Sequence, residues 1–103
     1  MTIIKDGHLY KLESLEGTNP QQLQFIEKQN VDGVFTTIND GTTNEEVLAM
    51  LIDRNEFLYR KLPSKETAEA IFHLREALRW FLERTRNRVA QGVENTPLPH
   101  KGE

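Results

Sequence analysis

The spacing of hydrophobic residues divides the chain near residue 42, with β-like runs before that point and a helical period after it. The β-like runs are 8–15, 22–28 and 34–38. Residues 17–20 have the composition of a turn, and Asp32-Gly33 is typical of a two-residue hairpin. The pattern therefore predicts an antiparallel meander of three strands within residues 1–41. A sheet this small is marginally stable unless a helix or a partner covers one face.

Apolar residues recur at a largely helical spacing from Val47 to Leu62. Thr43 stands three residues before Glu46, which is the pattern of a capping box. The sequence therefore predicts a first helix over about residues 43–61.

A second helical pattern follows Pro63-Ser64, where the proline ends the first helix and the serine caps the second. We expect this helix to end near Gln91, with Gly92 as a left-handed cap. Helices joined by so short a connection form an antiparallel hairpin. The longer second helix would extend past the first and leave an apolar stripe exposed, which favours self-association.

The predicted fold class is therefore α+β, with a small antiparallel β-meander followed by a long two-helix hairpin. We expect a single domain over residues 1–96, made of the meander (1–41) and the hairpin (42–92). Residues 93–103 are expected to form an extended tail because they contain two prolines. The exposed stripe predicts that the protein is oligomeric.

Composition excludes several classes of protein. The chain has 103 residues and no cysteine, which rules out disulfide scaffolds, thiolate zinc sites and cysteine nucleophiles. The first residues lack the apolar run of a signal peptide, and no stretch approaches the ~20 apolar residues of a membrane span. The expected location is a reducing cytoplasm, without a membrane partner.

Charge is unevenly distributed along the chain. Residues 1–53 carry three basic and nine acidic residues, and the remainder carries ten basic and seven acidic ones. Five arginines lie at positions 75, 79, 84, 86 and 88. This asymmetry indicates either an anionic ligand near the C-terminal segment or simply a solvated helix face. The net charge of −3 argues against a nucleic-acid coat.

Residues with catalytic chemistry are too scattered for an active site. The serines are Ser14 and Ser64, the histidines lie far apart, and the glycines form no phosphate-binding loop. No base stands beside a nucleophile in a recognisable motif. We therefore expect no enzyme activity, no metal site and no cofactor.

The most informative candidate for ligand binding is a pair of arginines. Arg84 and Arg88 are four residues apart, so they share a helix face and can grip a pyrophosphate with bidentate hydrogen bonds. Arginines are also common in the last turn of a helix, where they suit the macrodipole. Phe57 and Trp80 could each stack on a base, or each could belong to the core or a subunit interface.

Three segments resemble the Thoeris anti-defence family and its anti-CBASS relatives, which phages use as cyclic-nucleotide sponges. The segments are Thr43–Arg54, Ser64–Ala68, and Glu76–Arg88 running into Gly92–Thr96. The last segment is the most specific, because its Trp, Glu-Arg-Thr and Gly-Val-Glu elements fall in register. The resemblance covers about residues 40–96, and the strand-rich N-terminus is similar to the anti-Thoeris branch.

The resemblance implies a non-enzymatic phage protein that binds signal nucleotides and withholds them from an effector. In the anti-Thoeris branch the ligand class is glycocyclic ADP-ribose, and some members hold cyclic oligonucleotides at a separate site. The family assembles from dimers into higher oligomers, for which we expect a hexamer, with pockets between subunits. The expected location is the host cytoplasm, with no DNA or RNA partner.

Carried over residue by residue, the resemblance assigns Phe57 as the stacking aromatic and Arg84 and Arg88 as the pyrophosphate grip. Thr67 falls where the family usually has Asn, so one hydroxyl replaces the paired donor and acceptor of an amide. Asn95 replaces a glycine in the closing Gly-Val-Glu-Gly-Thr pattern.

Two rival functions remain at the level of sequence. A helical hairpin can dock a host protein through Trp80 and its apolar stripe, which would tolerate loss of the arginines. RNA binding by the basic helix is disfavoured by the acidic N-terminal half and predicts a steep dependence on salt.

Overall fold

A computed structural model describes residues 1–91 of the chain. The predicted Gly92 cap, the predicted extended tail (93–103) and the Asn95 departure lie outside the described residues. After Thr43 the chain passes from one compact unit, made of strands, to a second, made of helices. Each unit is described by itself below.

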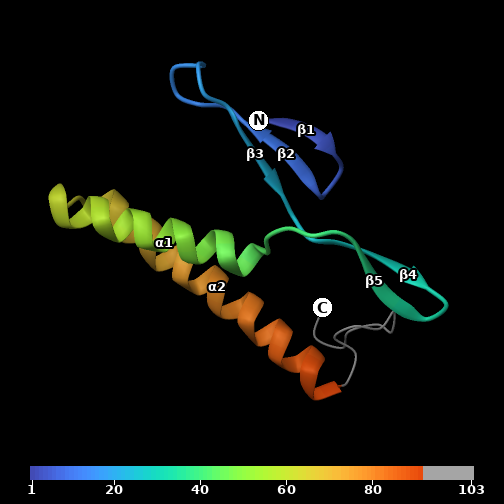
Figure 1. Cartoon of the computed structure of the whole chain (residues 1–103). Helices are drawn as coiled ribbons and strands as arrows, with labels where there is room; N and C mark the ends of the chain where they lie inside the picture. Colours follow the sequence, from blue (N-terminus) through green and yellow to red (C-terminus); the bar gives the residue numbers. More distant parts are fainter. Residues whose placement is uncertain (92–103) are drawn as a thin grey trace. The chain divides into compact units, whose positions relative to one another are not determined.

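The strand unit contains a three-stranded antiparallel sheet in the order β1-β2-β3 and a separate two-stranded hairpin, β4-β5 (Figure 1). The strands are β1 (Thr2–Lys5), β2 (Leu9–Leu12), β3 (Gln21–Gln24), β4 (Glu27–Val31) and β5 (Val34–Asn39). The predicted hairpin turn is confirmed, because Asp32 and Gly33 both have positive φ angles, 51° and 81°, as a two-residue turn of type I′ requires.

The expected three-stranded meander was assigned the wrong strands. β1 was missed, and the run predicted as one strand over 22–28 is two strands that belong to different sheets. The break has a physical cause, because the segment after β5 returns alongside it. Thr42 donates to the carbonyl of Gln24 (2.8 Å) and accepts from the Ile26 amide (2.9 Å). At Gly41 a Cβ would stand 2.4 Å from the Gln24 carbonyl oxygen, so this approach requires glycine.

A partly buried ion pair ties the two sheets of the strand unit together. Glu27, at the start of β4, is 8% exposed and accepts a hydrogen bond from Lys5 of β1 at 2.8 Å. Asn39 of β5 donates a second hydrogen bond to the same carboxylate at 3.0 Å. The Lys5 hydrogen bond, followed by that of Asn39, lowers the pKa of Glu27.

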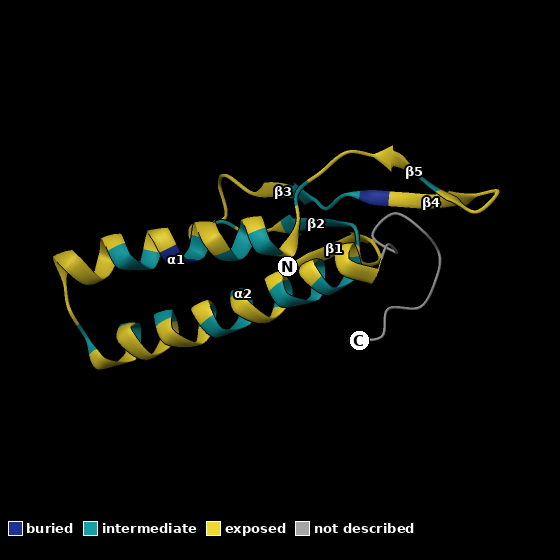
Figure 2. Ribbon diagram, turned by 90° about the horizontal axis from the view of Figure 1, so that it is seen from below, coloured by how far each residue is buried: buried dark blue, intermediate teal, exposed yellow. Residues whose placement is uncertain are grey.

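The helical unit confirms the predicted hairpin. Helix α1 spans Asn44–Lys61 and α2 spans Lys65–Gln91, within about a residue of the expected bounds. Figure 2 shows the two helices side by side, joined by a short connection, with their partly buried residues on the facing sides. Ile52 is 7% exposed and is the buried apolar residue among those the structure describes. The α+β class is therefore confirmed, with strands followed by two long helices.

The connection between the helices has the predicted cap. The Thr67 amide donates to Ser64 Oγ at 3.1 Å, as expected of an N-cap serine. Within residues 1–91, neither helix combines the length and the apolar character that crossing a bilayer requires.

Candidate functional site

The two predicted phosphate-binding arginines lie near the C-terminal end of α2. Arg84 and Arg88 are one turn apart and each is partly buried. Arg86 lies between them in sequence but points to another side of the helix, is mostly exposed, and pairs with Glu83. The structure therefore separates the candidate pair from its neighbouring arginine.

These arginines belong to the part of α2 that extends past α1. With ~1.5 Å of rise per residue, α1 is about 27 Å long and α2 about 40 Å, so the last nine or so residues of α2 have no α1 turn beside them. Figure 1 shows this extension, coloured orange to red. The side chains of Arg84 and Arg88 accordingly lie on the part of α2 that α1 does not accompany.

Phe57 lies on the outer side of α1. It is five residues after the buried Ile52, which rotates it by about 140° around the helix axis and away from α2. Its side chain is 49% exposed. Lys61 Nζ lies 4.9 Å from the centre of the ring, in a cation–π contact. The Lys61 cation therefore lies over one face of a ring that is otherwise half-exposed.

Thr67 has a structural role that the family resemblance did not indicate. Its Oγ1 accepts a hydrogen bond from Ser64 Oγ at 2.9 Å, while its amide donates to the same serine. The side chain is partly buried at the start of α2. Part of the hydroxyl's hydrogen-bonding capacity is thus used within the helix cap, and a lone pair remains for a ligand.

A single chain does not bring the four predicted residues together. Thr67 and Arg84 are both on α2, seventeen residues apart, and therefore about 26 Å apart along its axis. Phe57 lies four residues before the end of α1, at the same end of the hairpin as Thr67. One end of the hairpin thus carries Phe57 and Thr67, and the other carries Arg84 and Arg88.

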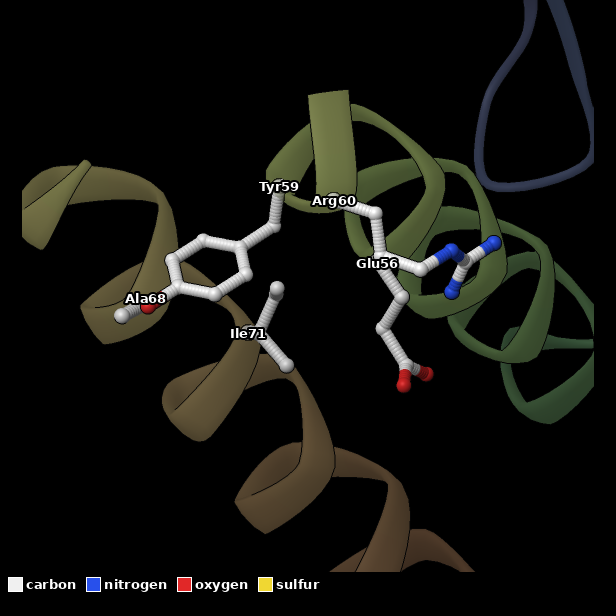
Figure 3. Close-up of a pocket in the computed structure, with 5 residues that line it drawn as sticks. All are labelled: Glu56, Tyr59, Arg60, Ala68 and Ile71. Atoms are coloured by element: carbon white, nitrogen blue, oxygen red, sulfur yellow. The ribbon is translucent and has the colours of Figure 1, made fainter. Parts of the chain in front are cut away.

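The structure also contains a pocket that sequence analysis missed (Figure 3). It has a volume of about 320 Å³ and lies between α1 and α2. Its lining residues are Glu56, Tyr59, Arg60, Ala68 and Ile71. In Figure 3 the Tyr59 ring lies over Ile71, with Glu56 and Arg60 on the other side. Tyr59 could have been found from its spacing, because it comes seven residues after Ile52 and so shares the side that faces α2.

A second, larger groove of about 510 Å³ follows one side of α2. It is lined by Arg75, Leu78, Arg79, Leu82 and Arg86. These arginines are all engaged with carboxylates of the same unit. Arg75 contacts Glu56 at 2.8 Å, Arg79 contacts Glu76 at 3.1 Å, and Arg86 contacts Glu83. The groove is therefore electrically balanced and is a poorer anion site than its arginine content suggests.

Metal chemistry has no support in the geometry of the described part of the chain. No three His, Asp or Glu side chains within residues 1–91 converge as a metal site would require. The one resolved His–carboxylate contact there, His73 with Glu69 at 3.8 Å, lies on the exposed surface of α2.

A comparison with curated proteins finds a similar phage protein. The chain is 40% identical over 58 residues to Thoeris anti-defense 1 of Bacillus phage SBSphiJ7, a match that covers 55% of this chain and 41% of that protein. The chain thus matches less than half the length of its relative. No family model and no solved structure matches. The similarity supports assignment to the Thoeris anti-defence family.

Proposed function

We propose that this protein is a phage anti-defence protein that binds an immune signal of the glycocyclic ADP-ribose class and withholds it without cleaving it. The observation that carries the proposal is the 40% identity to Thoeris anti-defense 1. In this proposal the protein acts in the host cytoplasm as a homo-oligomer built from dimers, and it needs no cofactor, membrane or nucleic acid.

The chemistry of the four residues fits such a ligand. The half-exposed Phe57 ring offers a stacking surface for adenine, a contact worth ~1–3 kcal/mol. Arg84 and Arg88 offer two guanidinium groups one turn apart, the spacing that suits a pyrophosphate. Sequestration at nanomolar affinity requires about −12 kcal/mol, which favours a pocket that covers both faces of the ligand.

The distances within the hairpin argue that two copies complete one site. A ligand that contacts Thr67 and Arg84 of the same chain would have to span about 26 Å of α2. In an antiparallel pair of hairpins, the end with Phe57 and Thr67 of one copy would lie beside Arg84 and Arg88 of the other. We propose this shared arrangement as the binding site.

The first test is reversible capture. The protein is incubated with glycocyclic ADP-ribose, freed of unbound ligand, and denatured, and the released nucleotide is identified by mass spectrometry. Recovery of the intact nucleotide is the expected result. Recovery of a cleaved product would instead identify an enzyme and would overturn the non-catalytic proposal.

The second test locates the site by calorimetry with matched variants. Arg84→Ala or Arg88→Ala removes a phosphate contact worth ~2–5 kcal/mol, so the dissociation constant should rise about 30-fold or more. Arg86→Ala is the control, because it deletes the same charge from the same helical segment on a different side. An equal loss in all three variants would indicate general electrostatics and not a defined grip.

The alternative function, a hairpin that docks a host protein, has one supporting observation. Trp80 is 60% exposed and Phe72 is 58% exposed, so α2 presents large apolar side chains to solvent. Docking of this kind would lose affinity in Trp80→Ala and not in Arg84→Ala, which is the reverse of nucleotide capture.

A further inference from the structure

The Phe57 ring has a cation on one face before any ligand binds. Lys61 is four residues after Phe57 on α1, so the two side chains share a face of the helix. Lys61 Nζ lies 4.9 Å from the centre of the ring, within the range of a cation–π contact. Lys61 is also the last residue of α1, where the helix dipole favours a positive charge. The end of α1 therefore holds an ammonium group against the ring.

The charge of this ammonium group is not neutralised in the described part of the chain. Within residues 1–91, Lys61 is paired with no carboxylate. The cation–π contact on α2 differs in this respect. Arg79 Cζ lies 4.6 Å from the centre of the Trp80 ring, but its guanidinium also donates to both carboxylate oxygens of Glu76, at 3.1 and 3.4 Å. Trp80 thus has a neutralised ion pair beside it, whereas Phe57 has a net positive charge.

A cation on one face of a ring changes which bases stack well on the opposite face. The cation draws the π electrons of the ring toward itself, so the opposite face becomes less negative and attracts an electron-rich, uncharged base. A base stacked there at van der Waals distance lies about 8 Å from Lys61 Nζ. That distance is comparable with the Debye length at physiological salt, so the charge of Lys61 is only partly screened. A base that carries a positive charge is therefore repelled.

We propose that Lys61 sets the ligand selectivity of the Phe57 ring, by favouring nucleotides whose base is uncharged and disfavouring those whose base carries a positive charge. This inference rests on the proposed function, because it requires the base of the ligand to stack on Phe57. The charge of the base decides here, and not the net charge of the ligand, which its phosphates make negative in either case. Lys61 thus acts through the ring as a selectivity residue.

Displacement calorimetry against glycocyclic ADP-ribose tests this selectivity. The two competitors are ADP-ribose and its 1-methyladenine analogue, which share the same diphosphate and riboses, whereas the methyl group gives the base a positive charge at neutral pH. Each is measured with the wild-type protein and with Lys61→Met, which keeps the apolar stem and removes the charge. Any steric effect of the methyl group is common to both proteins and cancels in the comparison.

The ratio of the two dissociation constants is the quantity to compare. The wild-type protein should disfavour the methylated competitor about three- to tenfold more than Lys61→Met does. Lys61→Met should also bind glycocyclic ADP-ribose itself about two- to fivefold more weakly, the usual size of an exposed cation–π contact. Lys61→Arg keeps the charge and should keep the wild-type ratio.

Arg60→Met is the matched control. It removes one positive charge from the neighbouring residue, which lines the pocket with Tyr59 and Ile71 (Figure 3), and it should leave the ratio unchanged. An unchanged ratio in Lys61→Met, or an equal change in Arg60→Met, would overturn the inference while the proposed function stands. Failure of the wild-type protein to bind glycocyclic ADP-ribose would overturn both.

The contact itself can be tested without ligand. In the wild-type protein the ring current of Phe57 should shift the NMR signals of the Lys61 ε-methylene protons upfield, and Phe57→Leu should remove that shift. Wild-type signals at the ordinary position of an exposed lysine would show that the ammonium does not stay on the ring, and would overturn the inference.

Discussion

A shared binding site makes a prediction that a site within one chain does not. Phe57→Ala removes the stacking ring but keeps Arg84, whereas Arg84→Ala removes a phosphate contact but keeps the ring. Each variant alone should bind glycocyclic ADP-ribose poorly, because every site in it lacks one of the two groups. When the variants are mixed, a pair that contains one copy of each has one site with both groups intact and one site with neither.

The size of the recovery follows from the arrangement. If copies exchange freely and pair at random, half of the pairs contain both variants, so about one quarter of all sites regain full affinity in an isologous dimer. The physical reason is the separation of about 26 Å along α2 between Thr67, at the Phe57 end of the hairpin, and Arg84, which in the proposed site assigns the ring and the guanidinium to different chains. Isothermal titration calorimetry of the mixture should report a stoichiometry near that fraction with the wild-type dissociation constant.

The control is a mixture of Arg84→Ala with Arg88→Ala. Both arginines lie at the same end of the hairpin, so every site in a mixed pair still lacks one of them and no binding should return. Recovery in this control, or no recovery when Phe57→Ala and Arg84→Ala exchange subunits, would refute the shared site. Exchange itself is verified by native mass spectrometry of the mixture.

Three further predictions concern the fold. Ile52→Ala should lower the free energy of unfolding by about 2–3 kcal/mol. This is the lower part of the range for Ile→Ala in protein cores, because the neighbours of Ile52 are only partly buried. An unchanged Tm would contradict the placement of Ile52 between α1 and α2. Ser64→Ala should cost about 1 kcal/mol, and Ser64→Asp should restore most of the lost Tm by accepting the same Thr67 amide. Because the pKa of Glu27 is lowered in the folded protein, its ionised carboxylate stabilises the fold fully at pH values above the ordinary glutamate pKa. This stabilisation is lost as the pH falls through the lowered pKa of the folded state. Glu27→Gln should therefore reduce Tm at neutral pH and have little effect in strong acid, and an equal loss at both pH values would exclude the ionised carboxylate as the cause.

The helical unit could be predicted from the sequence because its signals are local. The capping pattern at Thr43, the Pro63-Ser64 break and the apolar spacing each depend on residues within a few turns, and the observed bounds of α1 and α2 agree with them. The strand unit could not be predicted to the same degree. The division of the run 22–28 depends on Thr42, which returns from almost twenty residues away and takes the backbone groups of Gln24 and Ile26.

The candidate site shows the same contrast between local and distant information. Spacing alone placed Arg84 and Arg88 on one face of a helix, and the structure places them there, partly buried. The side of α1 on which Phe57 lies follows from its spacing to Ile52 only once Ile52 is known to be the buried residue, and no spacing rule indicated that the Thr67 hydroxyl takes part in the cap of Ser64. The pocket between Tyr59 and Ile71 was missed because it requires two helices in a particular register.

The proposed sharing of the site between two copies has a thermodynamic consequence for signal capture. A ligand that contacts Phe57 of one copy and Arg84 of another binds the assembled pair and not the separate chains, so ligand binding and association must strengthen each other. Ligand binding would then weaken when the protein is diluted below the dissociation constant of the dimer. Added ligand would lower the dissociation constant of the dimer, by the same free energy with which dimer formation strengthens ligand binding. A pocket within one hairpin, such as the one lined by Tyr59, has no such dependence on protein concentration. Affinity measured across a dilution series therefore distinguishes the two locations without any substitution in the chain.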